Sequence, residues 1–224
     1  KFPGHFFRLL EQSMVTPAQI LPPYAHICAL IAAPALSTLP AHAVPQETVT
    51  VGFRCQATPP IGAPQEFNLD VDVTGDAPAT ATTGDTVTLI ITPAEMTVPA
   101  DVSGYQVQSI RGLRLLVPHP ANSSHLSTTV SGGTVPASST RTDDTTVVAI
   151  PGPIPGGASV TLPTVTHSVR GHSNSTITTT LAGTGHHDPG LTFTATIATF
   201  IGSIDIPVAC YPDPAPTLTT TITT

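Results

Sequence analysis

Tryptophan is absent from the sequence, and aromatic residues make up only 4% of its 224 residues. Domains that bind sugars commonly present large aromatic side chains as stacking platforms, so this scarcity argues against a dedicated carbohydrate site. Phe53, Phe67 and Phe193 fall on strand faces that we expect to be buried. Tyr105 and Tyr211 are left as the candidate exposed binding residues.

Charged residues are also scarce, at 9% of the chain, and no lysine follows Lys1. From residue 44 onward five arginines are set against thirteen carboxylates, a formal charge of 5 − 13 = −8. Such a surface disfavours nucleic acid and anionic lipid as partners. No phosphate-binding glycine motif (G-x-x-x-x-G-K-[ST] or G-x-G-x-x-G) and no G-x-S-x-G turn occurs, so the sequence indicates no cofactor and no such serine nucleophile.

Helical spacing of apolar residues is lacking as well, whereas the chain has 25 prolines and 17 glycines. What is present is alternation: Phe67 to Thr74 and Thr86 to Thr92 place apolar side chains on one face and Asp, Asn or Thr on the other. This period of two is typical of half-buried strands. About nine such short strands, separated by turn residues, predict an all-β fold, a single immunoglobulin-like β-sandwich over residues 44–212.

Two of these strands end in a cysteine on their apolar side. They are Thr48 to Cys55, at the start of the domain, and Ser203 to Cys210, at its end. The third of the three cysteines, Cys28, lies in an N-terminal apolar segment whose removal would leave an even pair. In an exported protein such a pair predicts a disulfide between Cys55 and Cys210; two buried free thiols are the alternative.

The first 43 residues differ from the rest of the chain. Two basic residues precede an apolar segment, roughly residues 27–39, and Ala41-His42-Ala43 follows it. This order predicts a signal-peptide-like targeting segment over residues 1–43, with an ordinary N-terminal helix as the alternative. The apolar run is too short and too broken by proline to be a permanent membrane anchor.

At the other end, residues 213–224 form a Pro/Thr-rich tail. Its proline run favours an extended, stiff backbone. We therefore expect a linker or stalk, unless Leu218 and Ile222 pair onto a sheet edge.

The order of strands and turns resembles that of exported, single-disulfide β-sandwich proteins of unknown function from mycobacteria and related actinobacteria. The resemblance covers roughly residues 48–216 and rests on these segments: Val51-x-Phe53-x-Cys55, Gly84 to Val87, the turn from Gly152 to Gly157 before Ser159 to Pro163, Thr176 to Leu181, Asp188 to Phe193, and Cys210 to Pro214. It implies a β-sandwich located outside the cytoplasm, and it brings no catalytic residue.

The most suggestive cluster for chemistry is His186-His187-Asp188. Imidazole and carboxylate ligands suit zinc or another divalent metal. Because adjacent strand residues point to opposite faces, the two histidines bind one ion only if they lie in a loop, which the nearby glycines and proline favour. A solvated turn explains the same residues.

These patterns favour a cell-envelope module with a structural or protein-binding role, whose partner would be an envelope protein or a glycan. One alternative is a metal-dependent hydrolase or lyase that uses His186, His187 and Asp188. Another is a carrier that holds a lipid or small ligand between sheets filled by Leu, Ile and Val. No catalytic residue is assigned, and the oligomeric state stays open.

Overall fold

The structure is a computed structural model, which describes residues 47–102, 104–200 and 202–224. The predicted targeting segment, residues 1–43, lies outside the described residues. The described part contains seventeen strands and no helix. They are β1 (Glu47–Ala57), β2 (Gln65–Asp76), β3 (Thr80–Ala81), β4 (Thr86–Pro93), β5 (Met96–Thr97), β6 (Asp101–Val102), β7 (Tyr105–Pro118), β8 (Ser123–Ser131), β9 (Ser138–Thr142), β10 (Thr145–Ile150), β11 (Ile154–Pro155), β12 (Ser159–Val160), β13 (Thr164–Gly171), β14 (Ser175–Thr179), β15 (Leu191–Thr199), β16 (Gly202–Pro212) and β17 (Thr219–Thr223).

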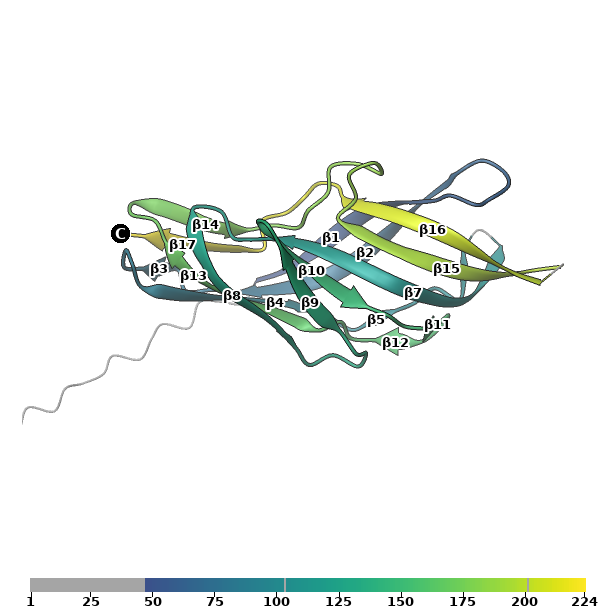
Figure 1. The fold of residues 1–224 in the computed structure, drawn as a ribbon, viewed down its shortest axis with the longest axis horizontal. Coiled ribbons are helices and arrows are strands. Elements are labelled where there is room, and N and C mark those ends of the chain that lie inside the picture. The colour runs from purple at the N-terminus through teal and green to yellow at the C-terminus, as the bar shows by residue number, and fades with distance from the viewer. Residues whose placement is uncertain (1–46, 103, 201) are drawn as a thin grey trace, which may run out of the picture. The chain divides into compact units, whose positions relative to one another are not determined.

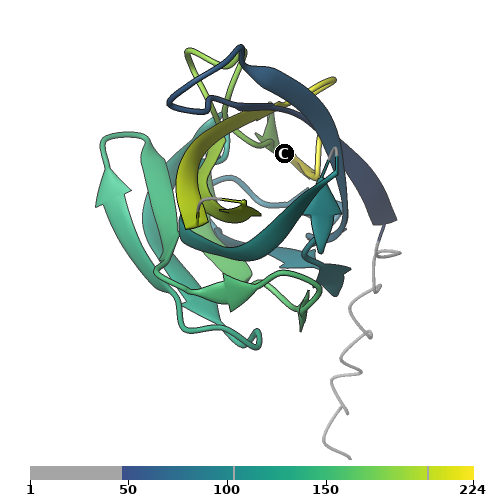
Figure 2. The same ribbon diagram turned by 90° about the vertical axis from the view of Figure 1, so that its right-hand side faces the viewer.

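One large sheet forms most of the fold (Figure 1). Its strands follow the order β8-β13-β4-β2-β1-β16-β15-β7-β10-β9, and β6 and β11 pair with β7. The two edge strands, β8 and β9, come beside each other, so the sheet is nearly closed. Figure 2 shows this ring of strands from one end. A sheet that curls this way keeps one face of every strand inside.

The prediction of an all-β fold is confirmed, whereas the number of strands was underestimated. Five of the seventeen strands are only two residues long, namely β3, β5, β6, β11 and β12. A two-residue strand has no alternation to detect. The immunoglobulin-like sandwich is not confirmed, because one sheet curves round to near closure where two facing sheets were expected.

Strand β1 shows how the sequence forms the interior. Val51, Phe53 and Cys55 are each 4% exposed or less, whereas Thr50 and Arg54 on the other face are exposed. The strand lies between β2 and β16 and pairs with both in antiparallel register. Burial of an apolar side chain of this kind contributes roughly 1.5–3 kcal/mol to the stability of the folded state.

The C-terminal residues, which we expected to form a linker, instead form strand β17. It pairs with β14 along its length and with β3 at its end. Leu218 is 4% exposed, and the threonines of β17 alternate between buried and exposed. The chain passes so close to Gly75 that a Cβ there would lie 1.9 Å from the carbonyl oxygen of Leu218. The proline run therefore connects to a strand that completes the fold.

Candidate functional site

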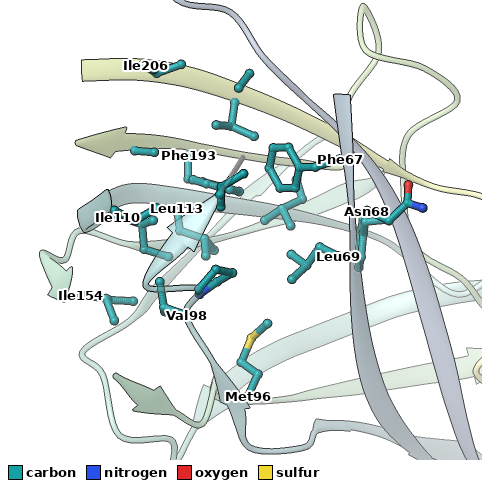
Figure 3. Close-up of a pocket in the computed structure, with 18 of the residues that line it drawn as sticks. Phe67, Asn68, Leu69, Met96, Val98, Ile110, Leu113, Ile154, Phe193 and Ile206 are labelled. Atoms are coloured by element: carbon teal, nitrogen blue, oxygen red, sulfur yellow. The ribbon is translucent and has the colours of Figure 1, made fainter. Parts of the chain in front are cut away.

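An apolar cavity of about 460 Å³ lies inside the curved sheet. This volume is within the range of small-molecule sites, roughly 300–1,000 Å³. Its walls come from strands far apart in the sequence, with β2 on one side and β7, β15 and β16 on the other. Figure 3 shows Phe67 of β2 and Phe193 of β15 directed into the same space, with Leu69, Met96 and Leu113 around them.

Alternation along the strands determines which side chains line the cavity. On β2, Phe67, Leu69 and Val71 point inward, and Asn68 between them is exposed. Strand β15 contributes every second residue from Leu191 to Ile197 in the same way. Because the outward positions carry the Asn, Asp and Thr residues, almost the whole lining is hydrocarbon.

Several large inward side chains are only half-buried. These are Phe67, Leu69, Ile110, Leu115 and Phe193. They pack against the core on one side and face open space on the other, so part of their dispersion contacts is missing. An apolar molecule in the cavity would supply those contacts and remove the apolar surface from water.

The cavity extends to one end of the sheet. Ile61, in the loop between β1 and β2, and Tyr105, at the start of β7, contribute to its lining and are themselves exposed. Gln65, Glu66 and Asn68 of β2 also line it and are exposed. A ligand held among the apolar strands would thus meet polar groups at this end, which we call the mouth.

The predicted disulfide is confirmed. Cys55 of β1 and Cys210 of β16 are register partners, with an S–S distance of 2.09 Å and a Cα–Cα distance of 4.0 Å. Both residues are fully buried. The bond fastens two neighbouring strands of the sheet, and Leu191 of the cavity wall pairs with Cys210.

His186, His187 and Asp188 do lie in a loop, as expected. Within it, the Thr184 hydroxyl donates a hydrogen bond to Asp188 Oδ2 (2.8 Å), and the His186 ring packs edge-on against Tyr211, with centroids 5.1 Å apart. In residues 47–102, 104–200 and 202–224, no group of three His, Cys, Asp or Glu side chains is placed to hold a metal ion. The hydrolase alternative gains no support here, and metal binding at these residues stays a prediction.

The two candidate tyrosines are not brought together. Leu191 pairs with both Cys210 and Leu115, so Tyr211 is level with the far end of β7 from Tyr105. About ten residues of strand separate those levels, on the order of 33 Å. Tyr105 belongs to the mouth, and Tyr211 to the region of the disulfide.

A cluster of three histidines was missed by the sequence analysis. His119 and His125 stack with ring centroids 3.8 Å apart, and His167 stands edge-on to both at 6.3 Å. Thr128 Oγ1 lies 2.8 Å from His125 Nε2 and 2.8 Å from His167 Nδ1. The Thr146 hydroxyl donates to Thr128 Oγ1 at 3.3 Å, which links β10 to β8 where the sheet is not closed by backbone hydrogen bonds.

Burial controls the protonation of this cluster. His167 is fully buried, and desolvation, followed by the nearby His119 and His125, lowers its pKa to about 4. Desolvation also lowers the pKa values of His119 and His125, with the charge of Arg141 adding to the effect in both. All three histidines thus favour the neutral form in the folded protein.

Comparison with known proteins supports the fold class. No protein-family model matches the chain, and no curated protein matches it. A crystal structure described as a "Putative membrane anchored protein from Corynebacterium diphtheriae" is similar, with a TM-score of 0.51 and 14% sequence identity. The match covers 80% of this chain and 38% of that chain, so this chain corresponds to well under half of its neighbour. In the described part of this chain no helix is long and apolar enough to cross a membrane.

Proposed function

We propose that this protein is a non-catalytic component of an actinobacterial-type cell envelope and that its β-domain binds a molecule with a long apolar chain, such as a fatty acid or an isoprenoid. The observation that carries this proposal is the hydrocarbon-lined cavity of about 460 Å³. The sequence favoured a structural or protein-binding role. A cavity of this size needs an explanation that such a role does not give, since protein interiors are normally close-packed.

The lining chemistry selects the ligand class. Side chains of Val, Leu, Ile and Phe offer no hydrogen bonds, so a sugar or peptide would lose its contacts with water on entry without compensation. A hydrocarbon chain has no such groups. Its polar head would stay at the mouth, beside Gln65.

Location outside the cytoplasm is part of the proposal. A fully buried disulfide is typical of oxidising compartments, and Cys55–Cys210 is such a bond. The structural neighbour from Corynebacterium diphtheriae is described as membrane anchored, which is compatible with an envelope location. The targeting segment inferred for residues 1–43 agrees with export and remains a proposal.

A cavity-filling substitution tests ligand binding. Ala195 of β15 lines the cavity, and Ala198 of the same strand lies on the opposite face. Ala195→Phe is expected to weaken binding of the fluorescent fatty acid cis-parinaric acid at least tenfold, about 1.4 kcal/mol, because the new ring occupies the site. Titration of the fluorescence at neutral pH measures the affinity.

Ala198→Phe is the matched control, because the same side chain is added outside the cavity. It should leave the fatty-acid affinity within about twofold of the parent protein, a difference of under 1 kcal/mol. Absence of measurable binding in the parent protein, or equal losses in both variants, would contradict the proposal. A structural or protein-binding role would then be the better explanation of the fold.

A further inference from the structure

Three of the large exposed apolar side chains of the described part lie in or next to turns. Ile61 is 91% exposed, Phe200 is 99% exposed and Tyr105 is 55% exposed. Ile61 lies in the β1–β2 loop, Phe200 between β15 and β16, and Tyr105 at the first position of β7. Single exposed apolar residues are ordinary on protein surfaces, so their relative placement is what matters.

Strand register and the cavity lining together place all three at the mouth. Ile197 pairs with Val107 and with Ile204, so Phe200, one residue beyond the end of β15, is about level with the start of β7 at Tyr105. The β1–β2 loop leaves the sheet near Pro207 of β16, whose carbonyl accepts a hydrogen bond from the Thr58 amide at 3.0 Å. Ile61 of this loop lines the same cavity as Tyr105. In Figure 1 these turns lie at the right-hand end, which is the end that faces the viewer in Figure 2.

The charged groups identified at this surface are acidic: Glu66 lines the mouth, and Asp101 Oδ1 accepts a hydrogen bond from the Gly104 amide beside Tyr105. No charged residue occurs in the β1–β2 loop, residues 58–64, or at Phe200 and its sequence neighbours. Lysine is absent from the whole described part, and its five arginines are outnumbered by thirteen carboxylates. Attraction to anionic lipid headgroups, which uses clusters of Lys and Arg, is therefore not available here. Insertion of apolar and aromatic side chains into an uncharged interface is available.

We propose that the mouth docks on a lipid layer with electrically neutral headgroups, and that Ile61, Tyr105 and Phe200 insert among those headgroups. Docking would place the entrance of the cavity against the layer, so that an apolar chain could pass between them without crossing water. This inference rests on the proposed ligand-binding function, which gives the lipid layer its role as the source or destination of the chain.

Vesicle sedimentation with the full-length, oxidised protein tests the docking. The vesicles are pure phosphatidylcholine, and the test variant combines Ile61→Ser with Phe200→Ser. We expect the parent protein to sediment with the vesicles and the variant to bind at least tenfold more weakly, since the two most exposed apolar side chains are lost. Binding should not increase when phosphatidylglycerol is added or when salt is lowered.

The chain offers a matched control. Leu126 of β8 and Ile222 of β17 are also exposed, at 47% and 52%, and neither lines the cavity. Leu126→Ser combined with Ile222→Ser should sediment like the parent protein. Equal losses in the two double variants would overturn the proposal, as would a parent protein that stays in solution or binds only anionic vesicles. A dimer in size-exclusion chromatography that Ile61→Ser/Phe200→Ser converts to a monomer would assign the mouth to self-association instead, and would also overturn it.

Fatty-acid titration without vesicles separates this proposal from the ligand-binding function. Phe200 does not line the cavity, so Phe200→Ser alone should weaken vesicle binding but bind cis-parinaric acid within about twofold of the parent protein. Vesicle binding that persists in Ala195→Phe would support docking even if the cavity proved to hold no fatty acid. Normal fatty-acid binding with no vesicle binding would reject docking and leave the cavity function standing.

Discussion

Replacing both Cys55 and Cys210 by alanine is expected to lower the free energy of unfolding by about 4 kcal/mol. The two residues are 155 apart in sequence, and a crosslink that closes so long a loop removes much of the conformational entropy of the unfolded chain. Strands β1 and β16 are neighbours near the middle of the strand order, and both contribute residues to the cavity wall. Loss of the disulfide therefore also removes a covalent link within that wall. Urea unfolding of the oxidised parent and the double variant measures the difference.

Cys28→Ala provides a control for the change in cysteine content, since Cys28 is not part of the bond. It should unfold at the same urea concentration as the parent protein. If the free energy of unfolding of the double variant is less than about 1 kcal/mol below that of the parent protein, the crosslink contributes little. That would be well under the roughly 2–5 kcal/mol usual for small secreted domains.

The two strands that end in cysteine were predictable because the alternation of apolar residues and the cysteine lie within one short segment in each case. Val51, Phe53 and Cys55 share a face by simple spacing, and all three are buried. The pairing with Cys210 followed from cysteine parity. What spacing could not supply was the order of strands, in which β1 lies between β2 and β16, while β7 lies between β15 and β10. That order depends on contacts between residues far apart in the chain.

The cavity shows a second limit of reasoning from pattern. Alternation placed Phe53, Phe67 and Phe193 inside, and all three do point inward. Only Phe53 is fully buried, at 4% exposure, whereas Phe67 and Phe193 are half-buried because they face the cavity. A strand pattern tells which way a side chain points, but not whether another side chain fills the space opposite.

The histidine cluster escaped notice because its members come from three separate segments. Sequence reasoning chose His186 and His187, which are adjacent in the chain. The clustered residues meet because β13 pairs with β8, which brings His167 opposite Thr128. One signal was available: His167 alternates with Val165 and Val169, so it occupies an inward position of an apolar strand. A histidine at such a position is expected to be desolvated.

Acid is expected to destabilise the fold through His167. The pKa of His167 is about 4 in the folded protein, and an unperturbed histidine in the unfolded chain has a pKa near 6.5. As pH falls below 6.5 the unfolded chain takes up this proton first, so unfolding becomes more favourable. Stability from neutral His167 is therefore complete above pH 6.5 and is lost progressively down to pH 4. A difference of about 2.5 pKa units corresponds to a loss of roughly 3 kcal/mol.

Urea unfolding between pH 7.5 and pH 4 measures this loss. His167→Gln should reduce the decline in unfolding free energy over that range by about 3 kcal/mol, since glutamine keeps a hydrogen-bonding group near Thr128 but does not titrate. The change with pH is the relevant quantity, so the comparison holds even if the variant is less stable at every pH. Some decline should remain, because burial also lowers the pKa values of His119 and His125.

His187→Gln is the matched control, because His187 is exposed in the loop between β14 and β15. Its stability should fall with pH in parallel with the parent protein. An equally steep decline in His167→Gln would show that His167 is not the source of the acid sensitivity. The expected outcome would instead connect pH to the gap between the edge strands β8 and β9. Protonation of His167 would place a charge beside His119 and His125. Arg141 acts on both of those rings, and Asp144 is the acidic group acting on His119. The buried charge on His167 would weaken the Thr128–Thr146 hydrogen bond, which joins β8 to β10 beside this gap.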